Sequence, residues 1–142
     1  MALILSIESA TKNCSVALAA DGEVISLKEL HEEKFSHAEK LHSFILEVMA
    51  SSDRKLAELD AVAVSKGPGS YTGLRIGVSA AKGLCYALGK PLISVPTLES
   101  LAREIAMTEK GVVVPLLDAR RMEVYSAVYN DHFEEIRETR AE

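Results

Sequence analysis

Several residue types are scarce or missing in this 142-residue chain, and each absence excludes a class of protein. There is no tryptophan and only 5% of the residues are aromatic, so the core must be mainly aliphatic. The two cysteines, Cys14 and Cys85, are too few for a disulfide framework or a zinc site. No apolar run approaches the ~20 residues that span a membrane, and the first residues lack the basic region of a signal peptide. We therefore expect a cytoplasmic protein with reduced thiols and no membrane association.

Basic residues are also in the minority, and the formal net charge is −5. Contacts to the phosphates of nucleic acids are made by lysine and arginine, which are scattered along this sequence. We therefore expect the chain alone to bind RNA or DNA only weakly. Hydrophobic residues make up 48% and charged residues 26%, which is typical of one globular domain with a real core.

The apolar pattern predicts a mixed α/β fold. Strands are expected over residues 3–8, 14–20 and 24–30, and Asp21-Gly22 between the last two is a strong hairpin signal. A helix is expected from Ser36, where Ser36 and Glu39 fit a capping box. Strands and helices then alternate, with strands over 61–65 and 92–95 and helices over 71–88 and 97–106. Two more strands, over 112–117 and 124–129, resemble the start of a second lobe, and the charged end "EEIRETRAE" lacks a closing element.

The stretch "SKGPGSYTGLRIGVSAAKGL", residues 65–84, contains five of the eight glycines and raises the question of phosphate binding. A P-loop needs a Lys-Ser or Lys-Thr pair after its last glycine, and this pattern fails. A dinucleotide loop needs the spacing G-x-G-x-x-G, and Gly67, Gly69 and Gly73 are one residue too far apart. A helix start still attracts anions, so Gly67 and Gly69, with Glu8 at the end of the first strand, are the candidates for a weak phosphate or nucleotide contact.

The same glycines also suit close packing. Gly73, Gly77 and Ala81 are spaced by four and share one stripe of the expected helix. An interior glycine costs a helix about 1 kcal/mol relative to alanine, so several in one helix need a reason. A stripe of small residues lets another backbone approach closely. From these residues alone, the stripe packs either inside the domain or against a partner protein.

No complete set of acid, base and nucleophile is present. His37 and His42 are five residues apart, which places them roughly 140° apart around a helix, so they cannot form a metal pair and are expected to be solvated. Ser70 is most simply a helix cap. Glu8 is positioned either to reach a metal-bound phosphate or to cap the next turn. We therefore expect no catalytic and no metal-binding residues in this chain.

Four motifs in the same order resemble the TsaB (YeaZ) family: "ESATKNCSVAL", "SHAEKL", "GPGSYTGLRIGVSAAKGL" and "LLDARRMEVYSAVY". The resemblance covers essentially the whole chain. It implies an actin/hexokinase/Hsp70-like (ribonuclease H-like) fold of two lobes, with residues 1–108 as the first lobe and 109–142 as the opening hairpin of an incomplete second lobe. The chain is then the front part of a longer protein.

The resemblance also implies a function in tRNA modification. Similar proteins are non-catalytic partners of TsaD, which works with the ATPase TsaE to place a threonylcarbamoyl group on the tRNA adenosine 3′ of the anticodon. This chain is then expected to need no cofactor, with ATP and a metal ion in the partner subunits, and to meet tRNA only through the complex. Thr97 and Leu101 stand where the catalytic paralogue has its two metal-binding histidines, and Glu8 stands where nucleotide-binding relatives commonly have aspartate. The family was once described as peptidases, and nothing in the sequence supports proteolysis.

In similar proteins the first two helices contact TsaD, or a second copy in a homodimer. The resemblance therefore favours packing against a partner protein for the stripe of small residues on the helix expected over 71–88. Gly77→Leu is then expected to abolish association without unfolding the lobe. The expected interface residues are Leu41, Phe44, Ile45, Val48, Leu74, Gly77, Val78 and Ala81. The rival hypothesis is an autonomous nucleotide-binding enzyme of the same fold, such as a small kinase or ATPase.

Overall fold

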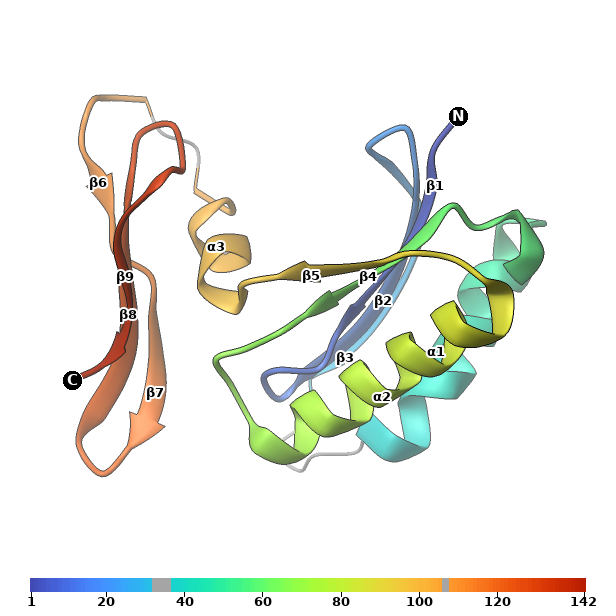
Figure 1. Ribbon diagram of the computed structural model, residues 1–142, viewed down its shortest axis with the longest axis horizontal. Coiled ribbons are helices and arrows are strands. Elements are labelled where there is room, and N and C mark those ends of the chain that lie inside the picture. Colours follow the sequence, from blue (N-terminus) through green and yellow to red (C-terminus); the bar gives the residue numbers. More distant parts are fainter. Residues whose placement is uncertain (32–36, 106–107) are drawn as a thin grey trace.

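The computed structural model describes residues 1–31, 37–105 and 108–142, which form two β-sheets and three α-helices (Figure 1). The helices are α1 (His37–Ser51), α2 (Tyr71–Leu88) and α3 (Thr97–Ala102), with a 3-10 turn at Leu56–Glu58. The strands of the first sheet are β1 (Leu3–Glu8), β2 (Asn13–Ala20), β3 (Glu23–His31), β4 (Ala61–Ser65) and β5 (Leu92–Val95). The strands of the second sheet are β6 (Val112–Val113), β7 (Leu116–Arg120), β8 (Glu123–Asn130) and β9 (Glu135–Ala141).

The first sheet has the order β3-β2-β1-β4-β5 and is mixed, as the sequence predicts. β1, β2 and β3 are antiparallel, and the Asp21-Gly22 turn joins the last two with both residues at positive φ. β4 and β5 are parallel to β1, because each is reached through a helical crossover. The carboxyl ends of β1 and β4 therefore lie side by side.

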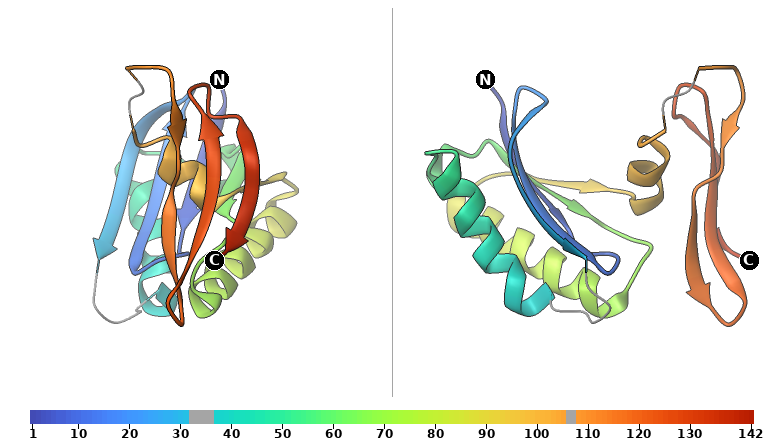
Figure 2. Two further views of the ribbon diagram at one scale, coloured as in Figure 1. Left: turned by 90° about the vertical axis from the view of Figure 1, so that its left-hand side faces the viewer. Right: turned by 180° about the vertical axis from the view of Figure 1, so that it is seen from behind.

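Both long helices cover the same face of this sheet (Figure 2). Alternate residues of β1, Leu3, Leu5 and Ile7, point toward the helices and are buried, while the residues between them are only half-buried. The register places Leu18 and Val16 of β2 beside Leu5 and Ile7 on this face. The main core thus lies between the sheet and the α1–α2 layer, and its side chains are mostly aliphatic, as expected from the lack of aromatics.

The second sheet has its own small core, to which α3 contributes. Strand β8 pairs antiparallel with β6, β7 and β9. Figure 1 shows α3 between the two sheets, and its Leu98 and Ala102 are fully buried in a cluster with Ala127 and Tyr129 of β8. Because α3 follows β5 directly, it connects the first sheet to the second.

Three expectations about local structure differ from the observed elements. The strand expected over 112–117 is divided into β6 and β7, since Pro115 has no N–H for a ladder hydrogen bond. The third helix ends at Ala102, and the Ala106 expected as its end lies outside the described residues. The charged end forms β9, so the expectation of no closing element was wrong. Ser36 of the expected capping box also lies outside the described residues.

Candidate partner interface

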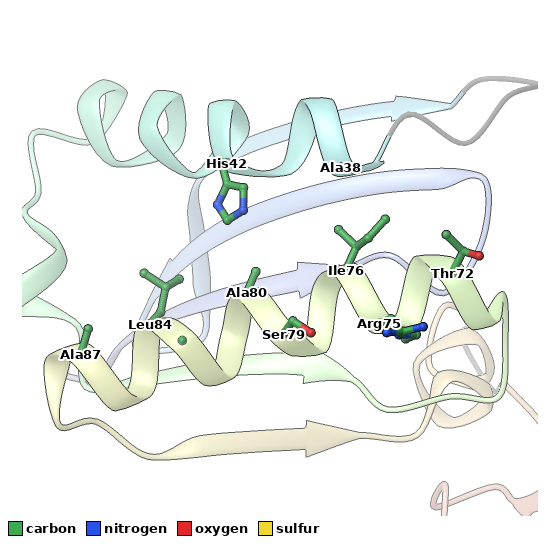
Figure 3. A pocket seen from close by; sticks show the side chains of 10 residues that line it. Ala38, His42, Thr72, Arg75, Ile76, Ser79, Ala80, Leu84 and Ala87 are labelled. Carbon is green, nitrogen blue, oxygen red and sulfur yellow. The ribbon is translucent and has the colours of Figure 1, made fainter.

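An open groove runs between α1 and α2 on the side of these helices that faces away from the sheet (Figure 3). Its volume is about 760 Å³. Figure 3 shows Thr72, Ile76, Ala80 and Leu84 pointing from α2 toward α1, and His42 pointing from α1 toward α2. The remaining lining residues are Ala38, Arg75, Ser79, Gly83 and Ala87.

The groove exists because small residues line it. Ala80, Gly83 and Ala87 of α2, and Ala38 of α1, extend too little to fill the space between the two helices. A Cβ atom added at Gly83 would have no heavy atom within 4 Å. Ile76 and Leu84 contribute apolar surface, and they also contact the buried core below. The result is an open, mainly apolar groove between the two helices.

The glycine stripe of α2 lies on a different side of the helix, against the end of β1. A Cβ atom at Gly73 would overlap the carbonyl oxygen of Ser9, and one at Gly77 would overlap the Ser9 hydroxyl. The Ser9 hydroxyl donates a 2.7 Å hydrogen bond to the carbonyl of Gly73, which fixes this close approach. The stripe therefore serves packing inside the lobe. Gly77→Leu should unfold the lobe, contrary to the expectation from the sequence.

The expected interface residues consequently need correction. Five of them point into the core between α1, α2 and the sheet and are buried, so they have no surface for a partner: Leu41, Ile45, Val48, Gly77 and Ala81. Phe44, Leu74 and Val78 are partly buried, and Phe44 and Val78 pack against that core. The two expected helices do form an open face, but its residues are those of the groove. The sequence pattern that could have predicted this face is the set of small residues at positions 80, 83 and 87, because their spacing of three and four places them on one side of the helix.

Glu8 and the glycine-containing loop before α2, residues 66–70, make contacts within the lobe. The two carboxylate oxygens of Glu8 accept hydrogen bonds from the Ser65 hydroxyl and, at 2.8 Å, from the Ala10 amide. The carboxylate thus joins the ends of β1 and β4. Gly69 lies so close to Ala10 that a Cβ atom would overlap its carbonyl, and the Ser70 amide donates to that same carbonyl at 2.7 Å. Gly67 has a φ of 106°, which only glycine adopts easily.

Ser70 is the N-cap of α2, as expected, and its hydroxyl accepts a hydrogen bond from the Gly73 amide. The backbone amides of Ser70 and Gly73, which a bound phosphate would need, therefore already donate hydrogen bonds within the protein. The candidate phosphate contact at Glu8, Gly67 and Gly69 gains no support from this geometry, although the loop borders a hollow that reaches Asp118 and Arg120 near the β7–β8 turn.

The histidines do not form a metal site. His37 is buried, and its Nε2 lies 2.6 Å from the Thr11 carbonyl, so the expectation of a solvated side chain was wrong for this residue. His42 is exposed in the groove. Thr97 is buried and Leu101 is half-buried, and neither side chain offers a metal a nitrogen ligand. Among the residues that the structure describes, no group of three metal-ligating side chains occurs.

The two cysteines are buried in the fold. Burial, and to a smaller degree the Glu8 carboxylate, raise the pKa of the Cys14 thiol, which keeps it protonated and unreactive. Cys85 is also buried, and its thiol lies 3.4 Å from the Pro91 carbonyl.

None of the helices in the described ranges has the length and apolarity that a membrane span needs.

Comparison with known proteins places the chain among proteins of tRNA threonylcarbamoyladenosine biosynthesis and their relatives. A family model described as TsaD, tRNA N6-adenosine threonylcarbamoyltransferase, matches residues 25–142. The tRNA threonylcarbamoyladenosine biosynthesis protein TsaB of Escherichia coli is 38% identical over 128 residues, which are 89% of this chain and 54% of that protein. The TsaB protein of Bacillus subtilis is 34% identical over 126 residues, covering 89% of this chain and 54% of the relative. The chain spans about half the length of these curated relatives.

Solved structures agree with these relatives. YeaZ from Pseudomonas aeruginosa superposes with a TM-score of 0.82 at 29% identity, over all of this chain and 65% of that one. The activator of 2-hydroxyisocaproyl-CoA dehydratase from Clostridium difficile has a TM-score of 0.56 at 10% identity, over 99% of this chain and 45% of that one, and supports the fold alone. The mixed sheet flanked by helices is thus the actin-like fold expected from the sequence. By sequence and by structure, this chain belongs to the TsaB (YeaZ) family, whose curated members are named for tRNA threonylcarbamoyladenosine biosynthesis.

Proposed function

We propose that this chain is a cytoplasmic, non-catalytic scaffold that docks onto TsaD through the α1–α2 groove and activates it. TsaD, with the ATPase TsaE, then transfers a threonylcarbamoyl group to the tRNA adenosine 3′ of the anticodon. The proposal assigns ATP and the metal ion to the partner subunits, and tRNA binding to the complex. In isolation a second copy of the chain takes the place of TsaD at the groove.

The single observation that carries this proposal is the open apolar groove. Soluble proteins rarely leave large contiguous apolar patches in water unless a partner covers them. The groove-lining side chains of Ile76, Ala80 and Leu84 lie on a helix whose opposite side is firmly packed on the sheet. A surface built on rigid helices changes little on binding, which reduces the entropy lost in association.

The absence of catalytic function in the proposal rests on what the candidate residues do. Thr97 and Leu101 cannot ligate a metal as histidines do, and Glu8 already accepts hydrogen bonds from Ser65 and Ala10. The rival hypothesis of a small kinase or ATPase needs a carboxylate and loop amides that are free to meet phosphate and metal. The observed hydrogen bonds and the close approach of Gly69 to Ala10 disfavour it.

The first test is association with the TsaD protein of the same organism. We expect light scattering after size exclusion to report a complex with one copy of each chain, because TsaD covers the apolar groove. Isothermal titration with TsaD should show a negative heat-capacity change, as apolar burial requires. If this chain and TsaD elute separately at micromolar concentrations, the proposed docking is wrong.

A second test separates the scaffold from the rival enzyme. Calorimetric titration of the isolated chain with ATP and magnesium should give no binding at millimolar nucleotide. Glu8→Gln should leave this result unchanged and lower the stability of the lobe instead, since it weakens the charge-assisted hydrogen bonds at the ends of β1 and β4. Saturable ATP binding that is lost in Glu8→Gln would favour the kinase or ATPase hypothesis.

A further inference from the structure

A second hollow lies between the first lobe and the β7–β8 hairpin, and its volume is about 540 Å³. Three segments far apart in the sequence form its walls: the turn after β1, the start of α2 and the β7–β8 hairpin. In Figure 1 these segments lie toward the lower end of the molecule, where β1 ends and α2 begins. The volume lies in the range of pockets that bind small ligands, so the hollow has room for a nucleotide-sized group.

The hollow carries positive charge, although the chain as a whole has a net charge of −5. Lys12, in the turn after β1, and Arg120, in the β7–β8 hairpin, line it from its two sides. Arg120 makes no ion pair with any residue that the structure describes. Asp118 supplies a carboxylate to the lining, and this carboxylate accepts a 2.8 Å hydrogen bond from the Arg120 amide. The hollow therefore suits an anionic ligand.

The hairpin that presents Arg120 has an unusual backbone. Arg120, Arg121 and Met122 have φ angles of 66°, 55° and 63°, so three successive residues other than glycine are left-handed. All three side chains are exposed, so core packing does not account for this turn. Residues with such backbone cluster at ligand-binding sites. The turn keeps Arg120 at the hollow, with a second cation next to it in Arg121.

An aromatic ring accompanies these cations. Tyr71, the first residue of α2, lines the hollow and is 75% exposed. The Arg75 guanidinium lies 5.6 Å from the centre of its ring. Proteins bind single-stranded nucleic acid by combining cations that follow the backbone with aromatic side chains on which bases stack. The lining of the hollow has both components.

We infer that this hollow holds a single-stranded stretch of RNA, with phosphates at Lys12 and Arg120 and one base against the Tyr71 ring. The inference rests on the proposed function, in which tRNA binds to the complex with TsaD, and it names residues of this chain that touch the tRNA. Two phosphate contacts are few, which agrees with weak binding by the chain alone.

Other anionic ligands fit the hollow less well. Lysine and arginine side chains suffice to contact an RNA phosphate. The phosphates of a free nucleotide are commonly held by loop amides, and those of Ser70 and Gly73 already donate within the protein. An acidic protein segment would meet the cations but would bring no base to the Tyr71 ring.

The test is Lys12→Gln with Arg120→Gln in the complex with TsaD of the same organism, titrated with fluorescently labelled tRNA. Each phosphate contact contributes a slope of about 0.7 to 0.9 in log affinity against log salt concentration. Loss of two contacts should therefore lower the slope by about 1.4 to 1.8 and weaken tRNA binding roughly 10- to 60-fold at about 0.1 M salt. Both residues are exposed, so circular dichroism should report an unchanged fold.

Tyr71→Ala separates stacking from charge. It should weaken tRNA binding about fivefold or more, because a stacked base loses its ring. The salt slope should stay as in the wild-type complex, since the tyrosine ring carries no charge. Size exclusion with TsaD checks that this variant still forms the complex.

The matched control is Lys55→Gln with Lys110→Gln, which removes two charges at exposed positions. Lys55 follows α1, and Lys110 precedes β6, which pairs with the opposite end of β8 from the hairpin. This control should change neither the salt slope nor the affinity by more than about twofold. Equal losses in the two double variants would show a general charge effect and overturn the inference. So would normal tRNA binding by Lys12→Gln, Arg120→Gln with loss of a protein partner, since a protein segment would then be the occupant.

Failure of the docking proposal gives a different result. If the wild-type chain forms no complex with TsaD, docking is wrong, and the same two double variants are compared as isolated chains at about 20 mM salt, where a few phosphate contacts suffice for measurable binding. A selective loss in Lys12→Gln, Arg120→Gln then supports the RNA site by itself, and equal affinities overturn it.

Discussion

Gly73→Ala should destabilise the first lobe by about 3 kcal/mol, even though alanine is the better helix former by about 1 kcal/mol. The added methyl would overlap the Ser9 carbonyl oxygen, which belongs to the backbone. That backbone has little freedom to move, because the neighbouring Ala10 is held by hydrogen bonds to Glu8 and Ser70. A loss of this size is a large part of the stability of a typical domain. Urea unfolding followed by circular dichroism measures it directly.

Gly83→Ala is the matched control in the same helix. The new methyl meets no heavy atom within 4 Å, so only helix propensity changes. This variant should gain roughly 0.5–1 kcal/mol in the free energy of unfolding. If the two variants instead have equal stability, the close approach of α2 to β1 does not constrain Gly73, and our account of the glycine stripe is wrong.

Gly83→Glu should abolish docking, with an affinity for TsaD reduced at least ~100-fold, while the chain stays folded. The position lines the groove and is open, so the side chain fits the free chain. Docking, however, would remove the carboxylate from water inside an apolar groove without a partner, which costs several kcal/mol. Size exclusion with light scattering, together with circular dichroism, should report a folded and unassociated chain.

A conservative substitution at the same position separates the effect of the negative charge from the effect of adding any side chain. Gly83→Ala adds only a methyl group to the groove and should keep the affinity for TsaD within about tenfold, since one methyl is a small volume change. Normal association of Gly83→Glu would place the interface elsewhere. Equal loss in both variants would mean that the groove is filled so tightly that any side chain at position 83 prevents docking.

Much of the local structure follows from short-range signals. The ends of α2 were predicted correctly because Ser70 caps its first turn and Gly89 ends it with a left-handed backbone at φ 65°. The strand over 61–65 was predicted from its own residues, because they are mostly apolar and include β-branched valines. By contrast, β9 has hardly any apolar pattern. It exists because β8 offers a free edge, and because Arg137 and Glu142 reach the Ser126 hydroxyl of β8.

The sequence by itself determined the family, the mixed α/β fold and the two helices of the candidate interface, because motifs, periodicity and capping residues act within a few positions. It also showed that α2 carries a stripe of small residues. Which side of α2 is open to the proposed partner was decided only by the tertiary structure. The end of β1 brings Ser9 and Ala10 against Gly73, Gly77 and Gly69, residues more than fifty positions away. Once that contact uses the glycine stripe for internal packing, the groove at Ala80, Gly83 and Leu84 is the side that remains open to a partner.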